Sequence, residues 1–383
     1  MNSPSGPIWF SILFLICAVK IVPIAKVYYF EISTYFLKFE KILKSIENLK
    51  NLEVGINGYY ILYRKSRRKS IITQSKPILI TGASSGIGKL VTEYLAQKDQ
   101  LVYACARKKK DIEKLNKVEN VTSFRLDVTN PLDVQKVVTR VKQEGRGLFG
   151  LVNNAGISDC WPILSTSEEM LHRVFNVNVY GPLRITNALI PYLIESQGRI
   201  VNVSSISGLF TPTYLGTYSM SKYALEAWSN ALSQELKNYN VKVSIIEPGN
   251  YKSNIVNASI PVLVERYKKT TNSLFQEEIE SIMSPEEEGK NNRENLPSPD
   301  EVADAVLDAL FNEHPKARYL VISQLESKLF PLVLKAQLVE VFQLFKDNCH
   351  RFTVKDLRNL LDEVIKEDIT IVDVKSWFYA DND

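Results

Sequence analysis

Cysteine and histidine are scarce in this sequence of 383 residues, and neither shows motif spacing. The four cysteines and three histidines are dispersed: Cys17, Cys105, Cys160, Cys349, His172, His314 and His350. A disulfide framework or a zinc site is therefore not indicated, and we expect no metal. A Ser-His-Asp hydrolase would also need a histidine in a supporting context, and neither His314 nor His350 has one.

A strong excess of charge of one sign is missing as well. The sequence has 47 basic and 43 acidic residues, a net charge of +4. This balance gives no positive indication of a nucleic-acid partner, and we expect none. With 45% apolar and 23% charged residues, the composition is that of a globular protein with one large domain and extensions.

An apolar run occupies residues 8–25, interrupted by Ser11 and Lys20. Its length is close to the roughly 20 residues that cross a bilayer. The positive region and small-residue cleavage site that mark a signal peptide are not convincing here. Residues 1–26 are therefore predicted to form an uncleaved membrane anchor, with a buried apolar helix as the alternative.

Apolar residues recur at helical spacing within residues 27–75: Tyr29, Ile32, Phe36, Phe39, Leu43 and Ile46. They predict an amphipathic helix that lies on a membrane, on the following domain or on a partner subunit. The basic linker at 64–69 would keep the rest of the chain cytosolic. Because no Arg-rich transit peptide is visible, we expect the endoplasmic reticulum, facing the cytosol, with a mitochondrial membrane as the alternative.

Short apolar segments typical of buried strands alternate with helical segments from residue 76 onward. The predicted strands lie at 78–80, 101–104, 121–126, 150–152, 199–203, 241–246 and 318–322. This alternation predicts an α/β fold, a doubly wound parallel sheet of Rossmann type, in one domain over residues 76–322. Residues 251–297 are charged and loop-like, and residues 323–383 are predicted to form a helical C-terminal extension.

A glycine-rich turn, Thr81-Gly-Ala-Ser-Ser-Gly-Ile-Gly88, follows the first strand and opens a helix. Glycine lets the backbone approach a pyrophosphate, and the helix N-terminus supplies free N–H groups. The spacing departs from G-x-G-x-x-G. The turn also matches the G-x-S-x-G element of hydrolases, which lacks its histidine here. A phosphate-binding P-loop is excluded by spacing and by Leu90 where Ser or Thr should stand.

Tyr218 and Lys222 are four residues apart on a predicted helix, so their side chains lie on one face. Ser205 ends a strand upstream, and Asn178 precedes it. A tyrosine has a pKa of about 10, and a nearby Lys⁺ is expected to lower it. Such a tyrosine can exchange a proton with an alcohol or carbonyl oxygen, with Ser205 hydrogen-bonding that oxygen.

Together these motifs resemble the short-chain dehydrogenases/reductases over roughly residues 76–254. The matching motifs are Thr81-Gly-x-x-x-Gly-x-Gly88, Asp127-Val128, Asn153-Asn-Ala-Gly156, Asn178, Ser205, Tyr218-x-x-x-Lys222 and Pro248-Gly249. Longer phrases around them are similar to the retinol, 17β-hydroxysteroid and membrane-bound 3-hydroxybutyrate dehydrogenases. The resemblance makes residues 76–322 a catalytic domain, with 251–297 as its substrate loop.

The resemblance implies a role for each matched residue. The implied catalytic residues are Asn178, Ser205, Tyr218 and Lys222, and Ser205 would also contact the substrate. The implied cofactor contacts are Thr81, Gly82, Ser84, Ser85, Gly86, Ile87, Gly88, Arg107, Asp127, Asn153, Ala155, Gly156, Tyr218, Lys222, Pro248, Gly249 and Ser253. Ser253 stands where the family usually has Thr.

The end of the second strand bears on cofactor choice. An acidic residue there would bind the ribose hydroxyl of NAD, but the chain has Ala106-Arg107-Lys108. Because a basic residue can pair with the 2′-phosphate of NADP, we expect NADP(H), with NAD(H) possible. Arg107 could equally be a solvated residue at a helix start.

The predicted function is interconversion of an alcohol and its ketone or aldehyde on a small lipidic substrate, a steroid or retinoid. A 3-hydroxy acid is the alternative, and it would need a cation from the substrate loop: Lys252, Arg266, Lys268 or Lys269. A non-catalytic, membrane-tethered binding protein is the second alternative. By analogy with the family we expect a homo-oligomer through the helices at 181–194 and 218–238.

Overall fold

The computed structural model describes residues 76–253, 255, 258–270, 273–283 and 296–323. The predicted anchor, the amphipathic helix with its basic linker, and residues 324–383 of the C-terminal extension lie outside these ranges. None of the helices in the described ranges is long and apolar enough to span a bilayer.

One sheet of seven parallel strands runs through the described residues, in the order β3-β2-β1-β4-β5-β6-β7. The strands are β1 (Ile78–Ile80), β2 (Val102–Ala106), β3 (Val121–Arg125), β4 (Gly150–Asn153), β5 (Arg199–Val203), β6 (Lys242–Pro248) and β7 (Arg318–Val321). The strand order reverses between β1 and β4, which is where ligands bind in open α/β sheets. The predicted doubly wound Rossmann-type sheet is confirmed.

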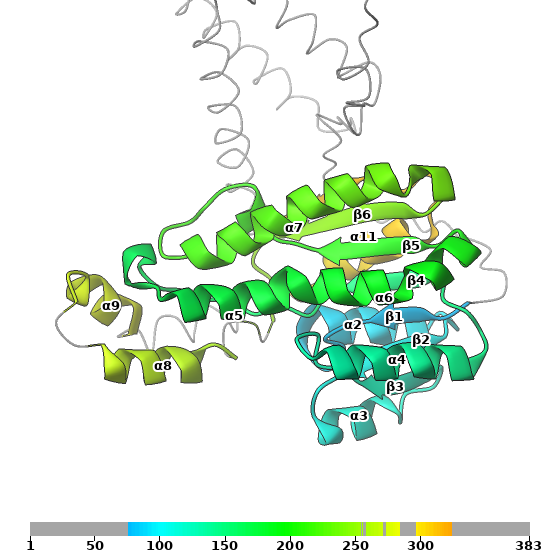
Figure 1. Cartoon of the computed structure of the whole chain (residues 1–383), viewed down its shortest axis with the longest axis horizontal. Helices are drawn as coiled ribbons and strands as arrows, with labels where there is room; N and C mark the ends of the chain where they lie inside the picture. Colours follow the sequence, from blue (N-terminus) through cyan, green and yellow to red (C-terminus); the bar gives the residue numbers. More distant parts are fainter. Residues whose placement is uncertain (1–75, 254, 256–257, 271–272, 284–295, 324–383) are drawn as a thin grey trace, which may run out of the picture. The chain divides into compact units, whose positions relative to one another are not determined.

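Helices cover both faces of this sheet (Figure 1). The helices are α2 (Gly86–Ala96), α3 (Lys109–Leu115), α4 (Pro131–Glu144), α5 (Glu168–Asn178), α6 (Tyr180–Ser196), α7 (Gly216–Glu235), α8 (Ile260–Lys269), α9 (Gln276–Met283) and α11 (Asp300–Phe311). Helices α2 and α11 pack on one face, and α4, α6 and α7 on the other.

The apolar strand runs follow from this arrangement. Ile78 and Ile80 lie in the cluster formed with α2 and α11, whereas Leu79 lies in the cluster formed with α4 and α6. Successive strand residues point to opposite faces, and because both faces are covered, most positions are apolar. The sheet is therefore buried on both sides.

Residues 251–297 differ from the loop that the sequence suggested, because they contain α8 and α9. Leu263 of α8 and Ile279 of α9 are buried against Trp161 in a small apolar cluster. The short amphipathic segments fold as helices because their apolar faces pack together in this cluster.

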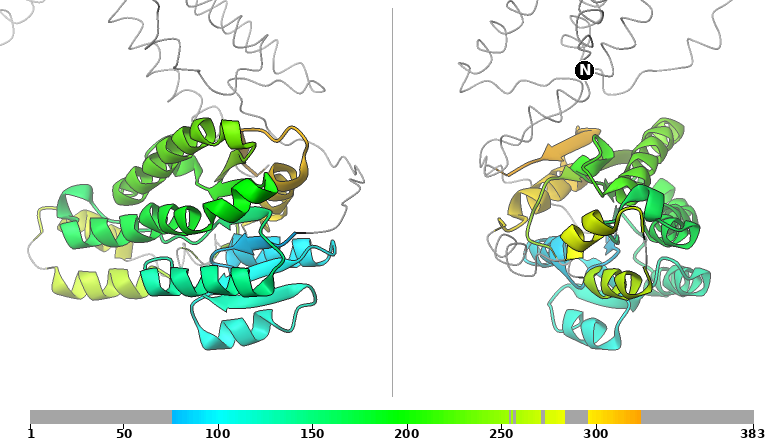
Figure 2. Two further views of the ribbon diagram at one scale, coloured as in Figure 1. Left: turned by 45° about the vertical axis from the view of Figure 1, so that its right-hand side comes forward. Right: turned by 90° about the vertical axis from the view of Figure 1, so that its left-hand side faces the viewer.

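The strand arrows in Figure 1 point toward the side on which α8 and α9 lie. The right-hand view of Figure 2 looks onto that edge of the sheet, with α8 and α9 in front. The residues that directly follow β1 to β6 therefore meet at one edge, and this edge holds the candidate site.

Candidate active site

The turn after β1 needs glycine at two of its positions. Gly82 has φ of +68°, a conformation that L side chains rarely adopt. A Cβ built on Gly88 would lie 2.3 Å from Asn154 Nδ2 and 2.5 Å from the backbone oxygen of Gly82. The glycines thus bring the start of α2 against the loop after β4.

Asn154, which the predicted set of contacts omits, holds this turn in place. Its Nδ2 donates to the backbone oxygens of Thr81 at 2.9 Å and Gly82 at 3.2 Å. The Thr81 hydroxyl accepts from the backbone N–H groups of Asn154 and Ala155, each at 3.0 Å. Thr81 is 2% exposed, so its side chain braces β1 against the loop after β4. In the sequence, the two adjacent asparagines at 153 and 154 were the signal that could have indicated this role of Asn154.

The N-terminus of α2 fits a diphosphate. Its N-cap, Ser85, makes no side-chain capping hydrogen bond, and its first turn has no acidic residue. By contrast, Asn130 caps α4 and Ser167 caps α5. A helix leaves its first N–H groups without intrahelical partners, and together with its dipole they favour an anion. The start of α2 can therefore hold the pyrophosphate of a dinucleotide.

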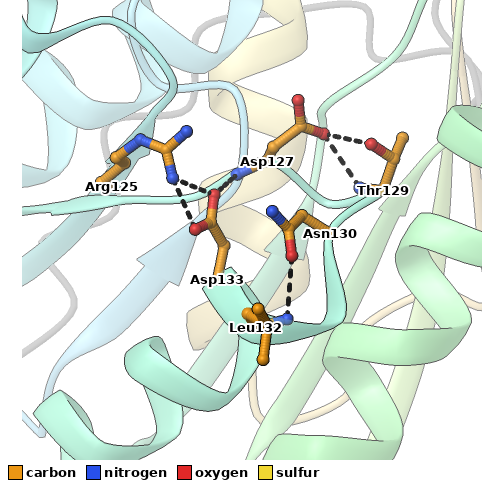
Figure 3. Close-up of polar contacts among 6 residues, drawn as sticks. All are labelled: Arg125, Asp127, Thr129, Asn130, Leu132 and Asp133. Carbon is orange, nitrogen blue, oxygen red and sulfur yellow. Dashed lines mark hydrogen bonds and ion pairs between the residues drawn. The ribbon is translucent and has the colours of Figure 1, made fainter.

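Asp127 follows β3 and is fixed by its neighbours (Figure 3). Its Oδ1 accepts from Thr129 N at 3.0 Å and from Thr129 Oγ1 at 2.7 Å. Its backbone N–H donates to Asp133, which also pairs with Arg125. Burial alone would raise the pKa of Asp127, but the Thr129 hydrogen bonds and the charges of Arg107 and Arg125 hold it below the usual value. A charged, oriented carboxylate therefore lies beside Arg107.

Asn153 faces the interior of the protein. It is 2% exposed, and its Nδ2 donates to Thr186 Oγ1 at 3.1 Å and to Asn202 Oδ1 at 2.8 Å. Its side chain ties β4 to β5 and α6. The structure therefore places Asn153 below the site, where it supports the loop that continues into Ala155 and Gly156.

The remaining predicted cofactor contacts lie along the same edge. Ser85 and Arg107 are exposed, and Ser84, Ile87 and Ser253 are partly buried. Pro248 ends β6, and the backbone N–H of Gly249 donates to Val321 O at 2.8 Å, which fixes the chain as it leaves the sheet.

Three predicted catalytic residues and Gly156 come together beside β4 and β5. Lys222 Nζ lies 5.5 Å from the ring centroid of Tyr218 and donates to Val203 O, at the end of β5, at 2.9 Å. A Cβ built on Gly156 would lie 3.5 Å from Asn178 Oδ1 and 3.9 Å from Lys222 Nζ. The ammonium is thus held between the two strand ends, next to the tyrosine ring.

Asn178 is 1% exposed and makes three side-chain hydrogen bonds. Its Oδ1 accepts from Ile157 N at 2.9 Å, and its Nδ2 donates to Ile157 O at 2.9 Å and to Ser221 Oγ at 3.0 Å. Asn178 therefore clamps the loop after β4 to the helix that carries Tyr218 and Lys222.

The sequence predicts a lowered pKa for Tyr218, but in the structure this pKa is raised. Burial raises the pKa of Tyr218 to about 12, and interaction with the Ser205 hydroxyl offsets this only in part. Burial lowers the pKa of Lys222 to about 8, against the charge of Glu226. Desolvation is the larger of the effects on Tyr218, so its hydroxyl keeps its proton at neutral pH.

Comparison with known proteins places this site in a family. The model of the family "short chain dehydrogenase" matches residues 76–261. The 17-beta-hydroxysteroid dehydrogenase type 6 of Rattus norvegicus is 32% identical over 282 residues, which cover 70% of this chain and 87% of that protein. The chain belongs to the short-chain dehydrogenase family. It is an NAD(P)-dependent alcohol dehydrogenase/reductase.

Two further proteins are similar to this short-chain dehydrogenase. Retinol dehydrogenase 5 of Homo sapiens is 34% identical over 211 residues, which cover 54% of this chain and 66% of that protein. A solved structure of a short chain dehydrogenase/reductase from Burkholderia phymatum, in complex with NAD, has a TM-score of 0.55 at 23% identity. It covers 65% of this chain and 89% of its own, and it supports the fold.

In this dehydrogenase, an ion pair ties α8 to the loop after β4. Arg266 Nη2 donates to Asp159 Oδ1 at 2.8 Å, and the two side chains are 13% and 2% exposed. The guanidinium also lies over the Trp161 ring, 4.7 Å from its centroid. Arg266 was one of the cations predicted for a substrate carboxylate, and here its charge is already neutralised by a buried aspartate.

Sequence reasoning missed Glu226, which faces the predicted catalytic lysine. Glu226 lies one helical turn after Lys222 on α7 and pairs with Arg318 of β7. Arg318 also pairs with Glu247 of β6. The four-residue spacing between Lys222 and Glu226 was the available signal, because such residues share a helix face.

Proposed function

We propose that this enzyme interconverts a secondary or allylic alcohol and its carbonyl on a steroid- or retinoid-like lipid, with NADP(H) as the preferred cofactor. The observation that carries the proposal is the meeting of Tyr218, Lys222, Asn178 and Gly156 beside the carboxyl ends of β4 and β5.

Each residue of the candidate site would have its own role in the reaction. A bound nicotinamide dinucleotide would supply or accept the hydride. Tyr218 would give its proton to the carbonyl oxygen in reduction and take it back in oxidation. Ser205 would hydrogen-bond the same oxygen as its charge develops. Lys222, fixed by Val203 O, would keep a positive charge beside the tyrosine.

The pKa of Tyr218 favours a role as a proton donor. Since that pKa is about 12, the hydroxyl stays protonated at neutral pH and is ready to protonate a carbonyl. The reverse reaction would need the phenolate, which higher pH supplies. We therefore infer that reduction is favoured near neutrality and oxidation at alkaline pH.

An apolar cluster supports a lipidic substrate. Trp161, Leu263 and Ile279 are buried together where α8 and α9 cover the loop after β4. Among the cations predicted for a 3-hydroxy acid, Arg266 pairs with Asp159, and Lys269 pairs with Glu265 at 2.7 Å. The partner of Arg266 is buried, which argues against a role of Arg266 in binding a small carboxylate substrate. The steroid and retinol named in two relatives agree with this choice.

The end of β2 supports NADP(H). Exposed Arg107 follows the strand where NAD-selective enzymes carry an acid. A guanidinium can pair bidentately with a 2′-phosphate. NAD(H) remains the alternative, since Arg107 also acts on the charge of Asp127.

The test is cofactor binding and turnover by the full-length chain. NADPH and NADH are titrated by fluorescence, and both are assayed with a steroid ketone, a retinaldehyde and acetoacetate. We expect NADPH-dependent turnover of a lipidic carbonyl, reduced at least about 1,000-fold in Tyr218→Phe, whose cofactor affinity stays near wild type. Turnover of acetoacetate alone would overturn the substrate class, and no cofactor binding by folded protein would overturn the enzyme.

Arg107→Ala tests the cofactor preference in the same titrations. We expect its NADPH affinity to fall about tenfold or more while NADH affinity is unchanged. Lys109→Ala is the matched control, because Lys109 is 91% exposed and pairs with Glu113 on its own helix. Equal weakening of both cofactors by Arg107→Ala would contradict the preference.

We also propose membrane association through residues 1–26, at the endoplasmic reticulum and facing the cytosol, and a homo-oligomer through α6 and α7. Tyr180 on α6 and Met220 and Tyr223 on α7 are large apolar side chains exposed by 45%, 45% and 38%. Such exposed groups on neighbouring helices are typical of subunit interfaces. Membrane fractionation would test the membrane association, and light scattering of the solubilised chain would test the homo-oligomer.

A further inference from the structure

Three ionisable side chains near the predicted catalytic lysine form a buried triad: Glu226, Arg318 and Glu247. Arg318 Nη2 donates to both Glu226 Oε2 and Glu247 Oε1. The side chains of Arg318, Glu226 and Glu247 are 12%, 7% and 0% exposed. Burying an ion pair is costly and is weak evidence of stability, so the triad needs another explanation.

The triad joins the parts that carry the predicted site. Glu226 lies on α7, one turn after Lys222. Glu247 lies on β6, directly before Pro248 and Gly249. Arg318 lies on β7, and its Nη1 reaches back to Asn230 Oδ1 of α7 at 3.2 Å.

The turn that follows Ser205 leaves space for the Glu226 carboxylate. A Cβ built on Gly208 would lie 3.0 Å from both Glu226 Oε1 and Ser204 Oγ. Glycine at this position therefore allows the carboxylate to approach the end of β5, where Lys222 Nζ is bound by Val203 O.

The two carboxyl groups are not equivalent. Burial, and then the charge of Glu226, raise the pKa of Glu247 to about 8 despite Arg318. Burial also raises the pKa of Glu226, but Arg318, Ser204 and Lys222 all oppose this. Glu247 thus keeps its proton at neutral pH, and Glu226 is the carboxylate that faces two cations, Arg318 and Lys222.

We propose that Glu226 is a positioning residue that acts as the buried counter-ion of Lys222, and that Arg318 holds its carboxylate in place. The proposal rests on the proposed function and deepens it. The charged and titratable groups that face Glu226 are Lys222 on its own helix, Arg318 on β7 and Glu247 on β6, while Ser204 and Gly208 beside Ser205 are uncharged. Without the charge of Glu226, Lys222 would share its buried surroundings with a second cation and would lose its proton at lower pH.

The test is the pH dependence of kcat/KM and of NADPH affinity in Glu226→Gln, with the full-length chain. In wild type we expect the NADPH-dependent reduction to fall above about pH 8, where Lys222 loses its proton. In Glu226→Gln we expect this fall to begin at least about one pH unit lower, so that kcat/KM at pH 9 is about tenfold below wild type. At pH 6.5 the two should agree within about threefold, and NADPH affinity should show the same shift.

Glu247→Gln is the matched control, because it makes the same acid-to-amide change on the other arm of the triad and imitates a protonated Glu247. We expect its activity profile to match wild type. Glu226→Asp keeps the charge at a greater distance from Lys222, and its fall in activity should lie between those of wild type and Glu226→Gln.

An equal loss of activity by Glu226→Gln at every pH would mean that the triad only stabilises the fold, and it would overturn the proposal. The proposal would also be overturned if activity began to fall at lower pH in Glu247→Gln but not in Glu226→Gln. If Glu226→Gln does not fold, a Glu226→Asp profile identical to wild type overturns it. Absence of NADPH binding by folded wild-type protein would instead overturn the proposed function.

Discussion

At the scale of single residues, the candidate site depends on a few close approaches. Gly88 is the clearest case, because the side chain of Asn154 and the backbone of Gly82 already occupy the place of a Cβ. Gly156 differs, since the nearest atoms to its would-be Cβ lie at ordinary contact distances of 3.5–3.9 Å. Two glycines of the same edge therefore have different tolerance for a methyl group.

We expect Gly88→Ala to destabilise the protein by about 1–3 kcal/mol and to abolish NADPH binding, because α2 must move away from the loop after β4. Gly156→Ala is the matched variant and should keep wild-type thermal stability. Thermal unfolding measures the stability of both variants, and fluorescence titration measures their affinity for NADPH. Equal melting temperatures for the two would show that the turn can relax without cost.

At the scale of elements, an apolar cluster and an ion pair hold α8 and α9 against the loop after β4. Arg266 of α8 meets Asp159 and Trp161 of the loop after β4, and both charges are nearly excluded from water. Removing one partner of a buried pair leaves the other charge uncompensated. The ion pair therefore fixes the two helices over the place expected for the substrate.

Asp159→Asn should loosen α8 and α9 and raise KM for the lipidic substrate about tenfold, with NADPH affinity unchanged. Hydrogen exchange in residues 258–270 and 273–283 should increase in parallel. Lys269→Ala is the control, because its ion pair with Glu265 is 74% and 69% exposed and contributes little. An unchanged KM in a destabilised Asp159→Asn protein would restrict the ion pair to a structural role.

At the scale of the whole molecule, the buried triad makes stability depend on pH. The folded-state pKa of Glu247 is about 8, above its ordinary value of 4.5. A group whose pKa rises on folding contributes stability below its unfolded pKa and loses that contribution as pH rises through the folded pKa. The contribution of Glu247 is therefore present near pH 4.5 and is lost by about pH 8.

Glu247→Gln removes this titration, so its melting temperature relative to wild type should rise between pH 5 and pH 8, by at least about 2 °C. Differential scanning calorimetry across this range measures the difference. Exposed Glu277→Gln is the control, and its difference from wild type should stay constant. A constant difference for Glu247→Gln as well would mean that Glu247 is ionised throughout.

The sequence by itself determined the sheet and the identity of the family. Strands buried on both faces read as apolar runs, so Ile78–Ile80 and its counterparts could be placed from local pattern alone. Short motifs also carry the predicted catalytic and cofactor residues, because their chemistry depends on residue type and close spacing. Local pattern failed for α8 and α9, whose helical form depends on covering Trp161 from elsewhere in the chain.

Only the tertiary structure decided which charged residues form ion pairs and in which direction side chains point. The Asn153 side chain, predicted to contact the cofactor, hydrogen-bonds Asn202, 49 positions away, inside the protein. Arg318 and Glu226 are 92 positions apart, and Arg266 and Asp159 are 107 apart. No local pattern encodes such pairs, and burial sets the pKa values of Tyr218 and Lys222, because desolvation depends on the atoms that folding brings around a group.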